Sequence, residues 1–258
     1  NGEIYNFRDL RDELEKFGHK FYTGTDTEVL VHAYEQYRED FIKLLRGMFA
    51  FCIYDRNENK IILGRDRSGK KPLYYVDNGN RFLFASELKA LLCDEELKKE
   101  INPEALHHYL TYGYVPTPLS ILKGIKKLEP GHYLVLKNKE ITVEKYWDIV
   151  YNEVKGTEDY FKKRIYEILK DSVKARLVSD VPLGALLSGG IDSSTIVGLM
   201  SQLAGNVKTF SAGFDEKDFD ELEYARIISE KFNTDHKEFI VNANLIKDIP
   251  MIAWHLDE

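Results

Sequence analysis

The stretch Leu187-Ser188-Gly189-Gly190-Ile191-Asp192-Ser193-Ser194 decides the fold of the second half of the chain. It ends an apolar run, residues 182–187, that predicts a buried strand, and it leads into a helical pattern over residues 194–203. Paired glycines let a backbone approach an anion closely, and the N–H groups at a helix start favour negative charge. The stretch therefore predicts an anion-binding turn between a strand and a helix.

The polar residues of this turn narrow the choice of anion. Ser188, Ser193 and Ser194 add hydroxyl donors. Asp192 would be repelled by phosphate alone, so we expect Mg²⁺ to bridge it to a polyphosphate. The turn lacks the four-residue spacer and the Lys-Ser/Thr ending of a Walker A loop. The competing interpretation is a plain strand-to-helix turn capped by Ser or Asp.

The sequence around this turn alternates between helical and strand patterns. The expected helices are 158–178, 194–203 and 221–232, and the expected strands are 182–187, 207–212 and 236–241. Strands that alternate with helices of this length predict βαβ units on a parallel sheet covered on both faces. Such sheets bind ligands at the carboxyl ends of their strands.

The first half has a different pattern. A helix over residues 7–17 with Asn6 as N-cap precedes a second helix, for which Thr25 and Glu28 have the form of a capping box. Short apolar runs then predict strands at 48–54, 60–64, 73–76, 81–85 and 132–136. This half is predicted to be an α+β domain with antiparallel sheets. A polar stretch at 147–159 separates expected domains 1–148 and 149–258.

Composition excludes several classes of function. The 258 residues carry 36 Lys and Arg against 43 Asp and Glu, a net charge of −7, which gives nucleic acid binding no electrostatic support. No apolar run approaches the ~18 residues of a membrane helix. Cys52 and Cys93 lie far apart, which fits a cytoplasmic protein without disulfides. The chain starts at Asn1 and ends inside a helical pattern, so we expect an internal piece of a longer chain.

Several motifs together resemble a known family. The loop Ser188 to Ser194 resembles the SGGxDSS pyrophosphate loop of the N-type ATP pyrophosphatases. The first half resembles a class II glutamine amidotransferase domain, in segments 1–6, 24–28, 64–67, 71–74 and 85–89. In this order the two resemble the glutamine-hydrolysing asparagine synthetase family. The resemblance implies an Ntn-hydrolase-like amidotransferase domain followed by an α/β parallel-sheet ATP pyrophosphatase domain.

The resemblance also implies roles for single residues. Asn1 and Gly2 match the oxyanion hole, and Glu3 and Asp26 match the carboxylates that receive the ammonium group of glutamine. Residues matching the ATP and pyrophosphate site are Leu187, Ser188, Gly189, Gly190, Asp192, Ser193, Ser194 and Ala212, the last through its backbone near adenine. Two simpler interpretations remain: Asn-Gly is a common turn pair, and an acid such as Asp26 is favoured in the first turn of a helix.

The reaction implied by the resemblance uses glutamine, aspartate, ATP and Mg²⁺. Glutamine is hydrolysed in the first domain, and ammonia then attacks an aspartyl adenylate in the second, releasing AMP and pyrophosphate. The family's nucleophile is an N-terminal cysteine, which this chain lacks. Alternatives are a related enzyme that makes β-lactams, lasso peptides or amidated surface sugars, and a noncatalytic nucleotide-sensing homologue. A homodimer is left open.

Three other features are given no catalytic role. His107 and His108 are adjacent on a predicted helix and so point in different directions, which is poor metal geometry. Cys52 lies in an apolar run expected to be buried, where a thiol acts as a small hydrophobe. The basic stretch 123–127 is expected to be a solvated loop.

Overall fold

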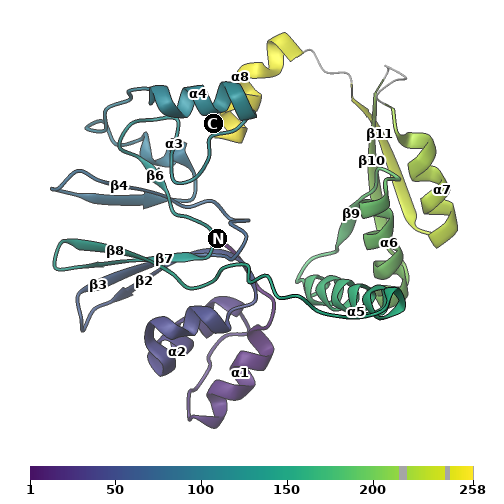
Figure 1. Cartoon of the computed structure of the whole chain (residues 1–258), viewed down its shortest axis with the longest axis horizontal. Helices are drawn as coiled ribbons and strands as arrows, with labels where there is room; N and C mark the ends of the chain where they lie inside the picture. Colours follow the sequence, from purple (N-terminus) through teal and green to yellow (C-terminus); the bar gives the residue numbers. More distant parts are fainter. Residues whose placement is uncertain (215–219, 242–244, 258) are drawn as a thin grey trace. The chain divides into compact units, whose positions relative to one another are not determined.

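The computed structural model describes residues 1–214, 220–241 and 245–257. The chain divides into two compact units (Figure 1). Unit 1 comprises Asn1–Tyr151 together with Ile249–Glu258, and unit 2 comprises Asn152–Asp248. Among the described residues, no helix is both long and apolar enough to cross a membrane.

Unit 1 contains two antiparallel sheets. The larger has the order β1-β2-β3-β7-β8, and the smaller has the order β5-β4-β6. The strands of the larger sheet are β1 (Gly2–Ile4), β2 (Gly47–Asp55), β3 (Lys60–Arg65), β7 (His132–Lys137) and β8 (Glu140–Lys145). Those of the smaller sheet are β4 (Tyr74–Asp77), β5 (Phe82–Ala85) and β6 (Lys126–Lys127). The predicted α+β class of this half is confirmed.

Helices complete four layers in unit 1 (Figure 1). On one side of the larger sheet lie α1 (Phe7–Lys16), α2 (Asp26–Tyr37) and the 3₁₀ helix η1 (Arg38–Leu44). Their core includes Leu14, Val29 and Phe41, all fully buried. A second core joins the two sheets through Leu63, Leu73 and Leu134 and neighbouring residues. The outer helices are α3 (Leu88–Leu91), α4 (Pro103–Tyr112) and the end of α8 (Leu245–Leu256).

A buried aspartate side chain organises the turn after β3. Asp66 is 1% exposed and accepts hydrogen bonds from the backbone N–H groups of Lys70 and Lys71, each at 2.9 Å. It also accepts from Phe49 N at 3.1 Å, and its own N–H donates to Phe49 O at 2.9 Å. Arg65 donates to the carbonyls of Lys71 and Gly69 at 2.8 and 2.9 Å. These two motif residues therefore stabilise the fold and fix β2.

Unit 2 is a three-stranded parallel sheet with the order β11-β10-β9. The strands are β9 (Gly184–Leu186), β10 (Lys208–Phe214) and β11 (Asp235–Val241), and the helices are α5 (Glu158–Arg176), α6 (Ile191–Ala204) and α7 (Leu222–Phe232). The apolar cores join α5 to α6 and α6 to α7. The predicted α/β class of this half is confirmed.

The expected cover on both faces of this sheet is wrong for the described residues. Along β10, Thr209, Ser211 and Gly213 are buried, whereas the alternate residues Lys208 and Ala212 are exposed. The strand order runs in one direction, and crossovers that are all right-handed then place α6 and α7 on the same face. Covering the other face would require the strand order to reverse.

The predicted N-cap positions, Asn6 for α1 and Thr25 for α2, are confirmed, but neither side chain makes a capping hydrogen bond, so the predicted capping box is wrong. The Asn6 side chain caps no helix; it accepts from Arg46 N at 2.9 Å and donates to Leu44 O at 3.0 Å. Thr25 makes no side-chain cap to α2, and its hydroxyl lies 3.0 Å from that of Thr23. In both cases a partner outside the helix replaces the local one.

Candidate functional site

The first candidate site is a pocket of about 300 Å³ in unit 1. Its wall includes all four residues predicted to bind glutamine, namely Asn1, Gly2, Glu3 and Asp26. The rest of the wall comes mainly from β2 and from the segment 84–86 at the end of β5. The structure therefore brings together residues that lie 25 positions apart in the sequence.

Hydrogen bonding along β1 leaves the Gly2 N–H facing away from the sheet. Asn1 and Ala50 exchange both of their backbone hydrogen bonds, at 3.0 and 2.8 Å. The next pair, Gly2 and Phe49, is consequently a non-hydrogen-bonded pair of the antiparallel ladder. The Gly2 N–H thus points to the open edge of β1, on the same side as the N–H of Ile4. It can donate to a ligand without breaking the sheet.

Gly2 is a glycine for a packing reason as well. Its φ is +127°, a region that side chains rarely adopt, and a Cβ would lie 2.0 Å from the carbonyl oxygen of Met48. Close approach to β2 therefore requires glycine here, whatever the pocket binds.

Asp26 joins α2 to β1. It is the first residue of α2, and its Oδ2 accepts a hydrogen bond from Ile4 N at 2.8 Å. This contact fixes the carboxylate beside Glu3, which is exposed. Two carboxylates in one pocket attract a cationic group such as an ammonium.

The expected burial of Cys52 is wrong. Its side chain is exposed and lines the same pocket as Asn1 and Gly2. In β2 it pairs with Leu63, so both side chains lie on the face toward the smaller sheet, where the pocket opens. Surrounding atoms still desolvate the thiol enough to raise its pKa.

The second candidate site is the turn between β9 and α6 in unit 2. Leu187 is buried, donates from its N–H to Phe210 O at 2.9 Å, and accepts from the hydroxyl of Ser211. Within the turn, the hydroxyls of Ser188 and Ser193 lie 3.1 Å apart. Ser211 thus anchors the turn to β10, next to Ala212, a role that the sequence reasoning did not assign.

The two glycines of the turn have different structural roles. Gly189 has φ of +80°, and a Cβ would lie 2.4 Å from the Cβ of Tyr224 and 2.7 Å from Ala225 N. Gly190 has φ of −67°, and its nearest neighbour to a Cβ is the Ser188 hydroxyl at 3.4 Å. Packing against α7 requires glycine at position 189. At position 190 no such packing contact exists among the described residues, and the absence of a side chain leaves the backbone accessible to a ligand.

Helix α6 begins at Ile191, three residues before the predicted start. Asp192 and Ser193 therefore lie in its first turn, where backbone N–H groups have no partner within the helix. The hydroxyl of Ser194 is buried and has no hydrogen-bond partner among the described residues. A donor of this kind fits an anionic ligand at the helix start. Asp192 is exposed there, which suits Mg²⁺ held by one carboxylate and by substrate phosphates.

Comparison with known proteins matches each half of the chain to a protein family. Residues 1–147 match the family described as glutamine amidotransferase domain. Residues 164–258 match the family described as asparagine synthase.

Individual relatives cover the chain from end to end. Asparagine synthetase [glutamine-hydrolyzing] 1 of Bacillus subtilis is 38% identical over 260 residues, which cover 100% of this chain and 41% of that protein. Asparagine synthetase [glutamine-hydrolyzing] 3 of the same organism is 33% identical, over 98% of this chain and 45% of that protein. The chain thus spans less than half of the length of these two relatives. A solved glutamine phosphoribosylpyrophosphate amidotransferase of B. subtilis covers 96% of this chain and 49% of its own, with 19% identity and a TM-score of 0.40.

Proposed function

This chain belongs to the glutamine amidotransferase family, and we propose that the protein makes asparagine from aspartate, with glutamine as nitrogen donor and ATP as energy source. The observation that carries the proposal is the presence of two sites in one chain. One is a pocket with two carboxylates and a backbone N–H that points away from its own sheet. The other is a Gly-Gly turn at a helix start, a kind of turn that can bind an anion. Amide transfer driven by ATP needs both.

In the first site we assign glutamine binding to Glu3 and Asp26, which receive the ammonium group. Oδ2 of Asp26 accepts from Ile4 N, and Oδ1, which lies 3.4 Å from the Thr27 hydroxyl, keeps a lone pair for the ammonium group. The Gly2 N–H and the Asn1 side chain hold the charge that develops on the amide oxygen during attack by a thiolate. Donors aimed at that charge stabilise the transition state more than the substrate.

In the second site we assign the phosphates of ATP to the start of α6. The N–H groups of its first turn and the hydroxyls of Ser188, Ser193 and Ser194 donate to the pyrophosphate portion. Mg²⁺ held through Asp192 supplies charge neutralisation of the leaving pyrophosphate. Ala212, an exposed residue of β10, receives the adenine at its backbone. Aspartate becomes an acyl adenylate, and ammonia displaces AMP from it.

Product analysis tests this proposal. The intact protein is incubated with ATP, Mg²⁺, aspartate and glutamine, and the products are followed by phosphorus NMR and amino-acid analysis. We expect AMP, pyrophosphate and asparagine in equal amounts. ADP with orthophosphate as main products would contradict the adenylation step, and AMP formation independent of aspartate would contradict the acceptor.

A further inference from the structure

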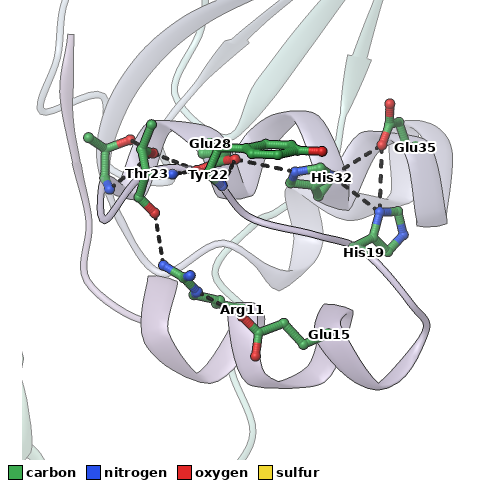
Figure 2. A network of polar contacts seen from close by, with 9 residues as sticks. Arg11, Glu15, His19, Tyr22, Thr23, Glu28, His32 and Glu35 are labelled. Carbon is green, nitrogen blue, oxygen red and sulfur yellow. Dashed lines mark hydrogen bonds and ion pairs between the residues drawn. The ribbon is translucent and has the colours of Figure 1, made fainter.

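Three side chains of unit 1 converge on one point away from the glutamine pocket (Figure 2). His19 lies in the connection between α1 and α2, and His32 and Glu35 lie one turn apart on α2. The Nδ1 atoms of the two histidines are 3.2 Å apart, and Glu35 Oε2 lies 3.2 Å from His32 Nδ1 and 3.6 Å from His19 Nδ1. The three atoms form a nearly equilateral triangle.

With both histidine rings neutral, no arrangement of protons turns all three of these contacts into hydrogen bonds. Each ring nitrogen carries at most one proton, and the carboxylate only accepts. If His32 Nδ1–H donates to Glu35, the lone pair of His19 faces the same carboxylate. If His19 Nδ1–H donates to His32, the lone pair of His32 faces Glu35. One repulsive contact remains in either arrangement.

The opposite nitrogen of each ring faces a side-chain oxygen, although only the His19 contact is within hydrogen-bond distance. His19 Nε2 lies 3.1 Å from Gln36 Oε1, and His32 Nε2 lies 3.6 Å from Glu28 Oε1. When the protons lie on the two Nε2 atoms, each Nδ1 carries a lone pair. The ring of Phe21 packs edge-on against His32, with centroids 4.4 Å apart, and fixes its orientation. In that tautomer, two lone pairs and a carboxylate oxygen point at one another.

A cation between the three atoms would remove the repulsion. Zinc binds His nitrogen and carboxylate oxygen at about 2.0–2.2 Å in tetrahedral geometry, which separates neighbouring ligand atoms by about 3.3 Å. The observed separations of 3.2, 3.2 and 3.6 Å match one face of such a tetrahedron. Both histidine side chains are about 15% exposed, whereas Glu35 is 56% exposed, so solvent reaches the fourth position.

We propose that His19, His32 and Glu35 bind a divalent transition-metal ion, zinc in the first place, with water as fourth ligand. The bound ion holds His19, which lies in the connection between α1 and α2, against α2. Glu28 also fixes this connection to α2, because its carboxylate accepts hydrogen bonds from the N–H groups of Tyr22 and Thr23, each at 2.7 Å. Because α2 begins at Asp26, the metal steadies the helix that carries this carboxylate.

Metal titration tests the proposal on the full chain freed of metal with a chelator. Zinc binding is measured by calorimetry, and cobalt is used as a coloured probe of geometry. We expect one zinc per chain, a rise in melting temperature on zinc addition, and cobalt absorption of the intensity typical of four-coordinate sites. His19→Ala, His32→Ala and Glu35→Gln should each weaken zinc binding about tenfold or more, and Gln36→Ala should weaken it to a smaller extent.

His107→Ala is the matched control, because His107 is exposed, lies on α4 and is not part of the converging group. It should bind zinc as the unchanged chain does. The proposal is overturned if the chain binds no zinc, if the three ligand variants bind it as tightly as the control, or if cobalt shows only the weak absorption of six-coordinate ions. Melting of the metal-free variants separates loss of binding from loss of folding.

Discussion

At the scale of single residues, Gly189 and Gly190 form a natural pair for mutation. Gly189→Ala forces a Cβ into the backbone of α7 at a φ of +80°, so we expect a loss of about 1–3 kcal/mol in the free energy of unfolding. Gly190→Ala meets nothing closer than 3.4 Å and should leave stability nearly unchanged. Urea denaturation of both variants measures the difference. Equal stability of the two would contradict the packing role of Gly189.

Cys52 allows a second prediction at this scale. It lines the pocket beside Asn1, yet desolvation raises its pKa, so little thiolate is present near neutral pH. We expect iodoacetamide to label Cys52 slowly at pH 7, and the pH of half-maximal labelling to lie above that of the same residue in the urea-unfolded chain. Mass spectrometry across a pH series gives the rate, and the urea-unfolded chain is the reference.

The same result bears on catalysis. A nucleophile for glutamine needs a thiolate near neutral pH, so Cys52→Ser should leave any glutamine hydrolysis unchanged. Half-maximal labelling below pH 8, or loss of glutamine hydrolysis in Cys52→Ser, would show that Cys52 is the reactive thiol.

At the scale of elements, the start of α2 depends on Glu28. Hydrogen bonds from the Thr23 hydroxyl and from the backbone of Tyr22 and Thr23 lower its pKa to about 2. A carboxyl group with a lowered pKa stabilises the fold above its unfolded pKa of about 4.3, and this stabilisation is lost as the pH falls toward 2. In metal-free buffer, Glu28→Gln should therefore flatten the fall in melting temperature between about pH 5 and pH 2.

Glu15→Gln is the control for this experiment. Glu15 forms an exposed pair with Arg11 on α1, at 3.0 Å, and such pairs contribute little to stability. Its melting curves should follow those of the unchanged chain at every pH. Equal acid sensitivity of Glu28→Gln and the unchanged chain would contradict the anchoring role of Glu28.

Most elements were predictable because their patterns are local. The strand predicted at 48–54 is Gly47–Asp55, and the helix predicted at 158–178 is Glu158–Arg176. The sequence reasoning missed β8 (Glu140–Lys145), whose residues are nearly all exposed and which depends on pairing with β7. The position of Asn6, which bonds to Leu44 and Arg46, depends likewise on contacts about 40 residues away.

Candidate site residues can be named from the sequence where a motif groups them. The turn 187–194 is contiguous, so its residues were found together. His32 and Glu35 have the spacing of one helical turn, a weak signal, but nothing in the sequence indicates that His19 joins them. Ser211 likewise acquires its role only when β10 pairs with β9 and its hydroxyl donates to Leu187 O.

At the scale of the whole molecule, contacts between residues far apart in the sequence help to hold unit 1 together. The carboxylate of Asp257 accepts hydrogen bonds from the N–H groups of Leu88 and Lys89, the latter at 2.9 Å, and thereby caps α3. Lys89 Nζ also donates to Trp254 O at 2.9 Å. No local pattern predicts a cap that lies 168 residues away.

The two candidate sites lie in separate compact units, which gives the last prediction. Asp192 is exposed at the second position of α6, so Asp192→Asn should leave folding intact and remove the carboxylate that we assign to Mg²⁺. We expect ATP turnover by the intact protein to fall at least about a hundredfold. Glutamine hydrolysis should remain, because Glu3 and Asp26 belong to the other unit.

Asp159→Asn is the matched control, because Asp159 is exposed and holds the same second position in α5. A carboxylate there interacts with the helix dipole as Asp192 does, but it lies outside the turn. If Asp192 acted only through its favourable interaction with the helix dipole, both variants would lose the same small amount of stability and keep ATP turnover. Loss of both activities in Asp192→Asn would show either a folding defect, which its melting temperature detects, or coupling between the two sites.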